Sequence, residues 1–231
     1  AGGRGFGGRL AILTNGGGIG VLATDTLIKA GGELASLAPE TLARLDAVLP
    51  KTWSKGNPVD IIGDAGAKRY ADALSLVLED PNVDTVLVMN CPAAVADSYW
   101  AAQAVIEAIG PNPAQRKRPV LTCWLGEGAA AASRRAFSAN RIPTYASPGD
   151  AVKAFMQLVR YRCNQELLME TPPSVPDNYR PDSARARLSS RRSSMAPDRP
   201  WRSASAMSSL LASRICASRA RRLRAPSVRA L

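Results

Sequence analysis

The sequence RLAILTNGGGIGVLATDTLIKA, residues 9–30, joins a short apolar run to a helical pattern through a glycine-rich loop. Residues 9–14 are predicted to form a strand, because the run is apolar and bounded by glycine. Residues 18–30 are predicted to form a helix, because apolar side chains recur there at helical spacing. Glycine fills four of the five positions 16–20, and it lets another group approach the main chain closely. The loop is therefore either a tight turn or a cradle for a ligand.

The sequence up to residue 165 continues to alternate between strand and helix patterns. Further strands are predicted at 33–37, 84–89, 119–124 and 142–145, and further helices at 39–49, 67–78, 98–109, 129–139 and 150–162. Residues 51–66 are predicted to be irregular. This alternation indicates an α/β fold with a doubly wound parallel sheet. We predict a flavodoxin-like sheet of five strands in the order 2-1-3-4-5.

The composition divides the chain into three parts. Residues 1–8 form a Gly-rich linker with a single RGG-like element, residues 9–165 form the α/β domain, and residues 166–231 form a linker and an Arg/Ser-rich tail. Residues 181–231 contain 12 Arg and 12 Ser but no Gly, Glu or Lys. We predict that this basic C-terminal tail is disordered, because it has too little periodic apolar content to bury. An out-of-frame translation is a second hypothesis for the same composition.

The formal net charge of +11 is concentrated in the tail. Residues 1–180 hold 18 Lys and Arg against 17 Asp and Glu, whereas residues 181–231 hold 12 against 2. A nucleic-acid-binding protein that uses the RGG-like N-terminus and the basic tail is therefore the alternative function. The predicted α/β domain itself carries no basic stripe with interleaved aromatic residues.

Several kinds of site are excluded by the residue types that the chain lacks. There is no histidine, and the four cysteines, Cys91, Cys123, Cys163 and Cys216, are widely spaced without a CxxC pair. This argues against a zinc site and against a Ser/His or Cys/His catalytic pair. We assign no catalytic residue and no metal ligand to this chain. The longest apolar runs are strand-sized rather than the ~20 residues that span a bilayer, and no signal-peptide pattern is found, so a cytoplasmic location is expected.

The glycine-rich loop lies where the predicted fold would bind a ligand. In an open α/β sheet, ligands bind beyond the carboxyl ends of the strands where the strand order reverses, and strand 84–89 with Asn90 ends at the same point. The first N–H groups of the following helix are unpaired and its dipole is positive there, which favours phosphate. The predicted phosphate-binding residues are Asn15, Gly16, Gly17, Gly18, Ile19 and Gly20. A tight turn remains the alternative, because the loop completes neither a dinucleotide fingerprint nor a P-loop.

Asn90 and two other segments are predicted to shape this site. The first is Asn57, Pro58, Val59 and Asp60, in which proline stiffens the loop and the Asn and Asp side chains can hydrogen-bond to nearby backbone. An Asx-turn that anchors a long connection is the alternative interpretation. The second is Glu127, which follows strand 119–124. It either faces the site or starts the next helix.

Taken in order, several segments resemble the ligase module of the NDP-forming acyl-CoA synthetases. The segments are RLAILTNGGGIGVLATDTL, GNPVDIIGDAGAKRYADAL, VDTVLVMNCP, PVLTCWLGE and IPTYASPGDAVKAFMQLVRYRCNQELLMETPPS. The likeness is collinear from Arg9 to Ser174. This family contains the ADP-forming acetate–CoA ligases and succinyl-CoA synthetase, and also bacterial protein lysine acetyltransferases with a synthetase-like region. The resemblance implies that residues 9–165 are a CoA-ligase domain.

The resemblance also implies a function for the loop at residues 15–20. In this family an acyl phosphate and CoA exchange through a phosphohistidine on another domain, and such a loop stabilises the transferred phosphoryl group. The complete enzyme uses CoA, ATP or ADP, phosphate and Mg, none of which this domain is expected to bind alone. The implied partners are the CoA-binding and phosphohistidine domains and an ATP-grasp domain or subunit. Because the chain has no histidine and no room for those domains, we predict that it is inactive in isolation.

Overall fold

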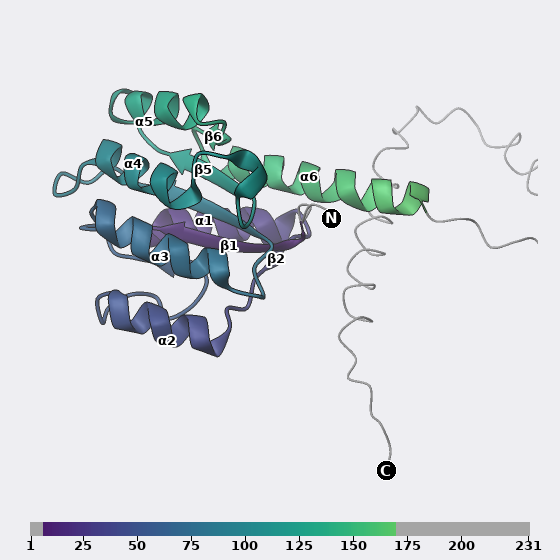
Figure 1. Ribbon diagram of the computed structural model, residues 1–231, viewed down its shortest axis with the longest axis horizontal. Coiled ribbons are helices and arrows are strands. Elements are labelled where there is room, and N and C mark those ends of the chain that lie inside the picture. Colours follow the sequence, from purple (N-terminus) through teal and green to yellow (C-terminus); the bar gives the residue numbers. More distant parts are fainter. Residues whose placement is uncertain (1–6, 170–231) are drawn as a thin grey trace, which may run out of the picture. The chain divides into compact units, whose positions relative to one another are not determined.

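The structure is a computed structural model, and it describes residues 7–169 (Figure 1). In chain order its elements are β1 (Arg9–Thr14), α1 (Gly17–Lys29), β2 (Glu33–Leu34), α2 (Pro39–Val48), β3 (Val59–Asp60), α3 (Ala67–Glu79), β4 (Thr85–Asn90), α4 (Ser98–Ile109), the 3-10 helix η1 (Pro113–Gln115), β5 (Val120–Trp124), α5 (Gly128–Ala139), β6 (Thr144–Tyr145) and α6 (Pro148–Met169). Most of the predicted linker at 1–8 and most of the predicted tail at 166–231 lie outside the described residues. Residues 166–169 continue α6, so the helix is longer than the predicted 150–162.

The predicted fold class is confirmed, with one correction to the sheet. All strands pair in parallel, in the order β2-β1-β4-β5-β6, which is the predicted order of the five expected strands. The sheet has a sixth strand, β3, which pairs with β1 from within the segment predicted to be irregular. Because β2 pairs only with Arg9 and Leu10, the same edge of β1 is open farther along, and Leu13 and Thr14 pair there with β3. A two-residue strand is too short to show a periodic pattern.

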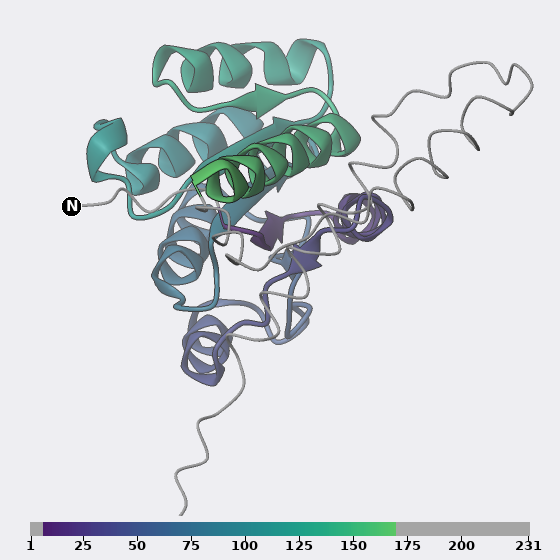
Figure 2. The same cartoon turned by 90° about the vertical axis from the view of Figure 1, so that its right-hand side faces the viewer.

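Helices cover both faces of the sheet (Figure 1, Figure 2). On one face, α2, α3, α4 and α5 bury the larger apolar cluster, which contains Tyr70, Trp124 and Phe137. On the other face, α1 and the first turns of α6 bury a second cluster through Leu27 and Phe155. The helices that follow the neighbouring strands β1 and β4 therefore leave the sheet on opposite faces. The carboxyl ends of these two strands are the position at which this fold class binds ligands.

An ion pair between β1 and the start of β4 fixes the opposite, amino edge of the sheet. The Arg9 Nε and Nη2 atoms donate to the two carboxylate oxygens of Asp84, at 2.9 and 2.7 Å, and the Arg9 backbone N–H adds a third bond at 3.1 Å. Burial raises the pKa of Asp84, but the hydrogen bonds from Arg9 outweigh it and hold the pKa below its ordinary value. Both side chains are about three-quarters buried, so this pair is shielded from solvent screening.

We expect Asp84→Asn to lower the free energy of unfolding by about 2 kcal/mol at neutral pH, because charge-assisted hydrogen bonds are lost. A depressed folded-state pKa stabilises the protein above the unfolded pKa of about 3.9, and this stabilisation is lost as the pH falls through the folded pKa. The difference between wild type and variant in urea unfolding should therefore shrink below about pH 4. Asp72→Asn, which removes an exposed pair with Lys68, should change stability by less than about 0.5 kcal/mol. A pH-independent difference for Asp84→Asn would contradict this account.

Candidate functional site

The helix α1 begins at the carboxyl edge of the sheet with unpaired backbone donors. Its N-cap residue, Gly16, has an extended backbone, and no side chain caps the helix. The first turn contains no acidic residue. The first helical bond runs from the Gly20 N–H to the Gly16 carbonyl at 3.2 Å. The N–H groups of Gly17, Gly18 and Ile19 have no acceptor within residues 7–169, so they remain available to an anion.

The four glycines of the loop differ in how much space surrounds them. A Cβ on Gly16 would lie 3.2 Å from the Cys91 Cβ, and a Cβ on Gly20 would lie 3.2 Å from the Thr14 methyl group. At Gly18 a Cβ would meet nothing within 4 Å. Gly16 and Gly20 therefore allow the loop to pack tightly against the loop after β4 and against β1. Gly18 instead leaves open space beside the free N–H groups.

The side chain of Asn15 joins the loops that follow β1 and β4. Its Nδ2 donates to the Cys91 carbonyl at 2.9 Å, and its Oδ1 accepts from the Cys91 N–H at 2.8 Å. The residue is only 4% exposed. Asn15 was predicted as a phosphate-binding residue, and the structure places its amide on Cys91. Its side chain joins the two loops, while the free N–H groups belong to Gly17, Gly18 and Ile19.

Asn90, at the end of β4, lies in a buried network below these loops. Its Nδ2 donates to the Tyr70 hydroxyl at 3.0 Å, and that hydroxyl donates to the Met89 carbonyl at 3.0 Å. Burial raises the pKa of Tyr70, so the hydroxyl stays protonated and able to donate. The sequence did not single out Tyr70, because a tyrosine on the apolar face of a helix has the pattern of a core residue.

The segment Asn57–Asp60 meets the glycine loop from the side of β3. The Asn57 Oδ1 accepts from the Ile12 N–H, and its Nδ2 donates to the Leu10 and Ala35 carbonyls, each at 2.9 Å. β2 pairs with the beginning of β1 and β3 with its end. The Asn57 side chain hydrogen-bonds to the backbone of β1 between these two pairings. Pro58 lies near the position that a Cβ on Gly20 would take, at 3.4 Å.

Val59 and Asp60 form β3 itself. Val59 is buried, and the Asp60 Oδ1 accepts from the Ile62 N–H at 2.9 Å. The predicted Asx-turn is therefore present, with Asp60 rather than Asn57 as its side chain. The segment contacts α1 at Gly17 and Gly20, which brings it to the candidate site.

Glu127 lies at the same edge of the sheet, after β5. It occupies the N-cap position of α5 and is exposed, as the second interpretation of its sequence position predicted. The preceding Gly126 has a φ of 89° and lies beside Pro92 of the loop after β4. No hydrogen bond joins Glu127 to the glycine loop in the described part of the chain.

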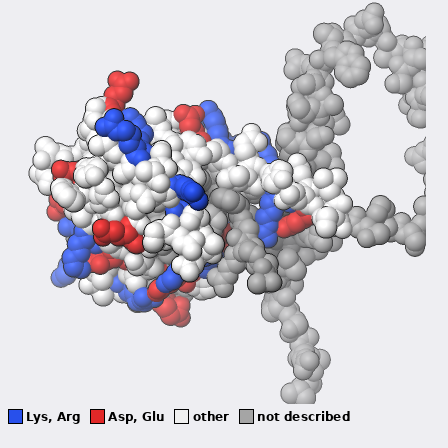
Figure 3. All heavy atoms as spheres, turned by 45° about the horizontal axis from the view of Figure 1, so that its top comes forward, with Lys and Arg blue, Asp and Glu red and all other residues white. Residues whose placement is uncertain are grey.

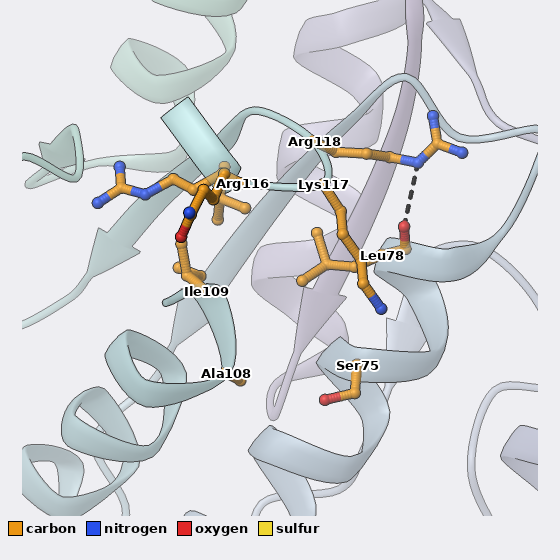
Figure 4. Close-up of a pocket in the computed structure, with 9 residues that line it drawn as sticks. Ser75, Leu78, Ala108, Ile109, Arg116, Lys117 and Arg118 are labelled. Atoms are coloured by element: carbon orange, nitrogen blue, oxygen red, sulfur yellow. Dashed lines mark hydrogen bonds between the residues drawn. The ribbon is translucent and has the colours of Figure 1, made fainter. Parts of the chain in front are cut away.

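A small cavity of about 150 Å³ lies at the opposite, amino edge of the sheet (Figure 4). Arg118 donates to the carbonyls of Leu78 and Asp80, and Arg116 donates to those of Asn140 and Arg141. Figure 4 shows these two arginines pointing in opposite directions. They satisfy the carbonyls at the ends of α3 and α5, where the helix dipoles are negative. This edge is therefore a less favourable place for an anion than the N-terminus of α1.

The charged side chains do not gather by sign on the face shown in Figure 3, where Lys and Arg alternate with Asp and Glu. Within residues 7–169, no group of three or more His, Cys, Asp or Glu side chains is placed to hold a metal ion. No helix in that range is both long and apolar enough to cross a membrane.

Residues 10–168 match the family described as the ligase-CoA domain. The ADP-forming acetate–CoA ligase I of Archaeoglobus fulgidus is 39% identical over 154 residues, which are 67% of this chain and 21% of that protein. Subunit alpha of the ADP-forming acetate–CoA ligase II of Pyrococcus furiosus is 33% identical over 160 residues, which are 68% of this chain and 35% of the subunit.

A solved structure of the dinucleotide forming acetyl-coenzyme A synthetase 1 of Ca. Korarchaeum cryptofilum, in complex with phosphate and ADP, has the same fold. It aligns with a TM-score of 0.64 at 31% identity and covers 72% of this chain and 36% of that one. The chain spans between about a fifth and about a third of the length of the curated relatives named above. These similarities support the resemblance found in the sequence and give no support to the nucleic-acid alternative.

Proposed function

Because the chain belongs to the ligase-CoA domain family, we propose that it is one ligase domain of an ADP-forming acyl-CoA synthetase and binds a phosphoryl group at the N-terminus of α1. The observation that carries this proposal is the set of free N–H groups at Gly17, Gly18 and Ile19, beside the open space at Gly18. The domain boundaries 9–165 and a cytoplasmic location are part of the proposal.

The N-terminus of α1 fits a phosphoryl group by its geometry and by its helix dipole. The N–H donors at the start of α1 are fixed by the helix, and its dipole adds partial positive charge. Asn15 and Asn57 hold the surrounding backbone through hydrogen bonds that are formed before any ligand arrives. Donors fixed in advance stabilise developing negative charge by a few kcal/mol each, because no reorganisation is needed when the group arrives.

The domain supplies binding and not the reacting nucleophile. The family resemblance implies a phosphohistidine and the chain contains no histidine, so in this proposal the residue that carries the phosphoryl group belongs to another domain or subunit of the same enzyme. CoA, ATP or ADP and Mg belong to those partner domains in this proposal. When bound there, they supply the acyl acceptor, the phosphoryl donor or acceptor and the charge neutralisation that phosphoryl transfer requires.

The proposal is tested by titrating the 15N-labelled protein with inorganic phosphate and following the backbone amides by NMR. We expect saturable shifts at Gly17, Gly18 and Ile19 at millimolar phosphate, and none with chloride at equal ionic strength. Gly18→Asp should weaken phosphate binding about tenfold or more, because it adds a negative charge where the anion binds. Gly18→Asn is the matched neutral control, and both side chains enter open space. The absence of shifts at residues 16–20 in the wild type would refute the site.

A further inference from the structure

The carboxylate of Asp60 lies against the first residue of α1. A Cβ on Gly17 would be 2.8 Å from the Asp60 Oδ2 atom. Because a carbon–carbon single bond is about 1.5 Å long, this oxygen lies within about 4.3 Å of the Gly17 Cα. The charge comes from β3, 43 positions along the chain, and sits beside the helix end that lacks an acidic residue of its own.

This carboxylate is held in place from several directions. Its Oδ1 accepts from the Ile62 N–H at 2.9 Å, and the Asp60 N–H donates to the Ser54 hydroxyl at 2.9 Å. The backbone of Asp60 pairs with Thr14 in the sheet. Ile62 has a φ of 70°, a strained conformation for a β-branched residue. The position of Asp60 is therefore fixed by the fold.

The second carboxylate oxygen has no partner of its own. Within residues 7–169, the Asp60 Oδ2 accepts no hydrogen bond, and Asp60 forms no ion pair. An anion near the start of a helix interacts favourably with the dipole and the free N–H groups. Asp60 thus takes, from outside the helix, the electrostatic role that an acidic first-turn residue usually has.

We propose that the Asp60 carboxylate acts as the internal anion of the α1 N-terminus and competes there with phosphate. This inference rests on the proposed function. Two negative charges a few ångströms apart repel each other. The site must therefore accept a phosphoryl group next to the negative charge that Asp60 already places there. The consequence is a weak site. Weak binding suits a domain that receives a phosphoryl group and passes it on, because a tightly held group would not leave.

The test compares phosphate affinities of the whole chain at about 0.1 M ionic strength, measured from the Gly18 amide shift. Asp60→Asn keeps the acceptor for the Ile62 N–H and removes the charge, and Asp60→Ser does the same with a smaller side chain. Both should bind phosphate about tenfold more tightly than the wild type. Asp25→Asn is the control, since it removes the same charge from an exposed position about 12 Å along α1, beyond a Debye length at 0.1 M salt. It should change the affinity less than about twofold.

A second measurement uses the wild type alone and so does not depend on a variant that folds. Phosphate that displaces or repels Asp60 should shift the Ile62 amide together with the glycine amides, with the same midpoint. Binding at the glycines with equal affinity in wild type, Asp60→Asn and Asp60→Ser would overturn the role of Asp60 and leave the phosphate site standing. If phosphate shifted the glycine amides in no variant, both the phosphate site and the role of Asp60 would be overturned.

Discussion

Replacement of Asn57 by alanine is expected to lower the free energy of unfolding by about 3–4 kcal/mol. The change removes three hydrogen bonds and leaves the Ile12 N–H and the Ala35 carbonyl without partners, whereas the Leu10 carbonyl still accepts from the Ala35 N–H at 2.8 Å. These backbone groups belong to buried residues, so water cannot replace the lost amide. Each net bond contributes about 1 kcal/mol, and each buried group left unpaired adds a desolvation penalty.

The loss is measured by urea unfolding at constant pH. Asn82→Ala is the control, because its side chain makes no hydrogen bond among residues 7–169, and it should cost less than about 0.5 kcal/mol. Asn57→Asp preserves the shape but cannot donate to the two carbonyls when ionised, so it should also destabilise the fold strongly at neutral pH. Equal stability of Asn57→Ala and Asn82→Ala would show that the amide does not bridge β1, β2 and β3.

Most strands of the sheet and the helices that cover it were predictable, because the sequence pattern of each element is local. The order of the five expected strands follows from rules on connections and handedness. β3 was missed because two residues after a proline have no periodicity, and their pairing with Leu13 and Thr14 depends on how short β2 is. That length is a tertiary outcome that no local pattern expresses.

The candidate site was predictable in its place and only partly in its roles. The glycine loop and the Asn57–Asp60 segment are brought together, although some 40 residues separate them. The roles of the Asn57 and Asn15 side chains depend on hydrogen-bond partners distant in sequence, since Asn57 bonds to Ile12 and Asn15 bonds to Cys91. The sequence showed polar side chains suited to bonding backbone, but it could not show which backbone groups would lack a partner.

The same reasoning predicts a smaller effect at Asn15, with a consequence for the site. Asn15→Ala removes both bonds to the backbone of Cys91 and should lower the free energy of unfolding by about 2 kcal/mol. The loss is smaller than at Asn57 because Cys91 is only half-buried, so water can reach its freed groups. Asn15→Asp keeps the acceptor for the Cys91 N–H and loses the donor, and an intermediate loss is expected.

Phosphate binding separates this role from direct contact with the ligand. If Asn15 only joins the two loops, Asn15→Ala should weaken phosphate binding at Gly18 by several-fold, because the free N–H groups lose their fixed position. In the wild type the side-chain NH2 signals of Asn15 should then stay in place while phosphate saturates the Gly18 amide, because this NH2 group donates to the Cys91 carbonyl. If the Asn15 amide instead touched phosphate directly, its NH2 signals would shift with the same midpoint as the Gly18 amide. The response of these signals therefore decides whether Asn15 joins the two loops or contacts the ligand.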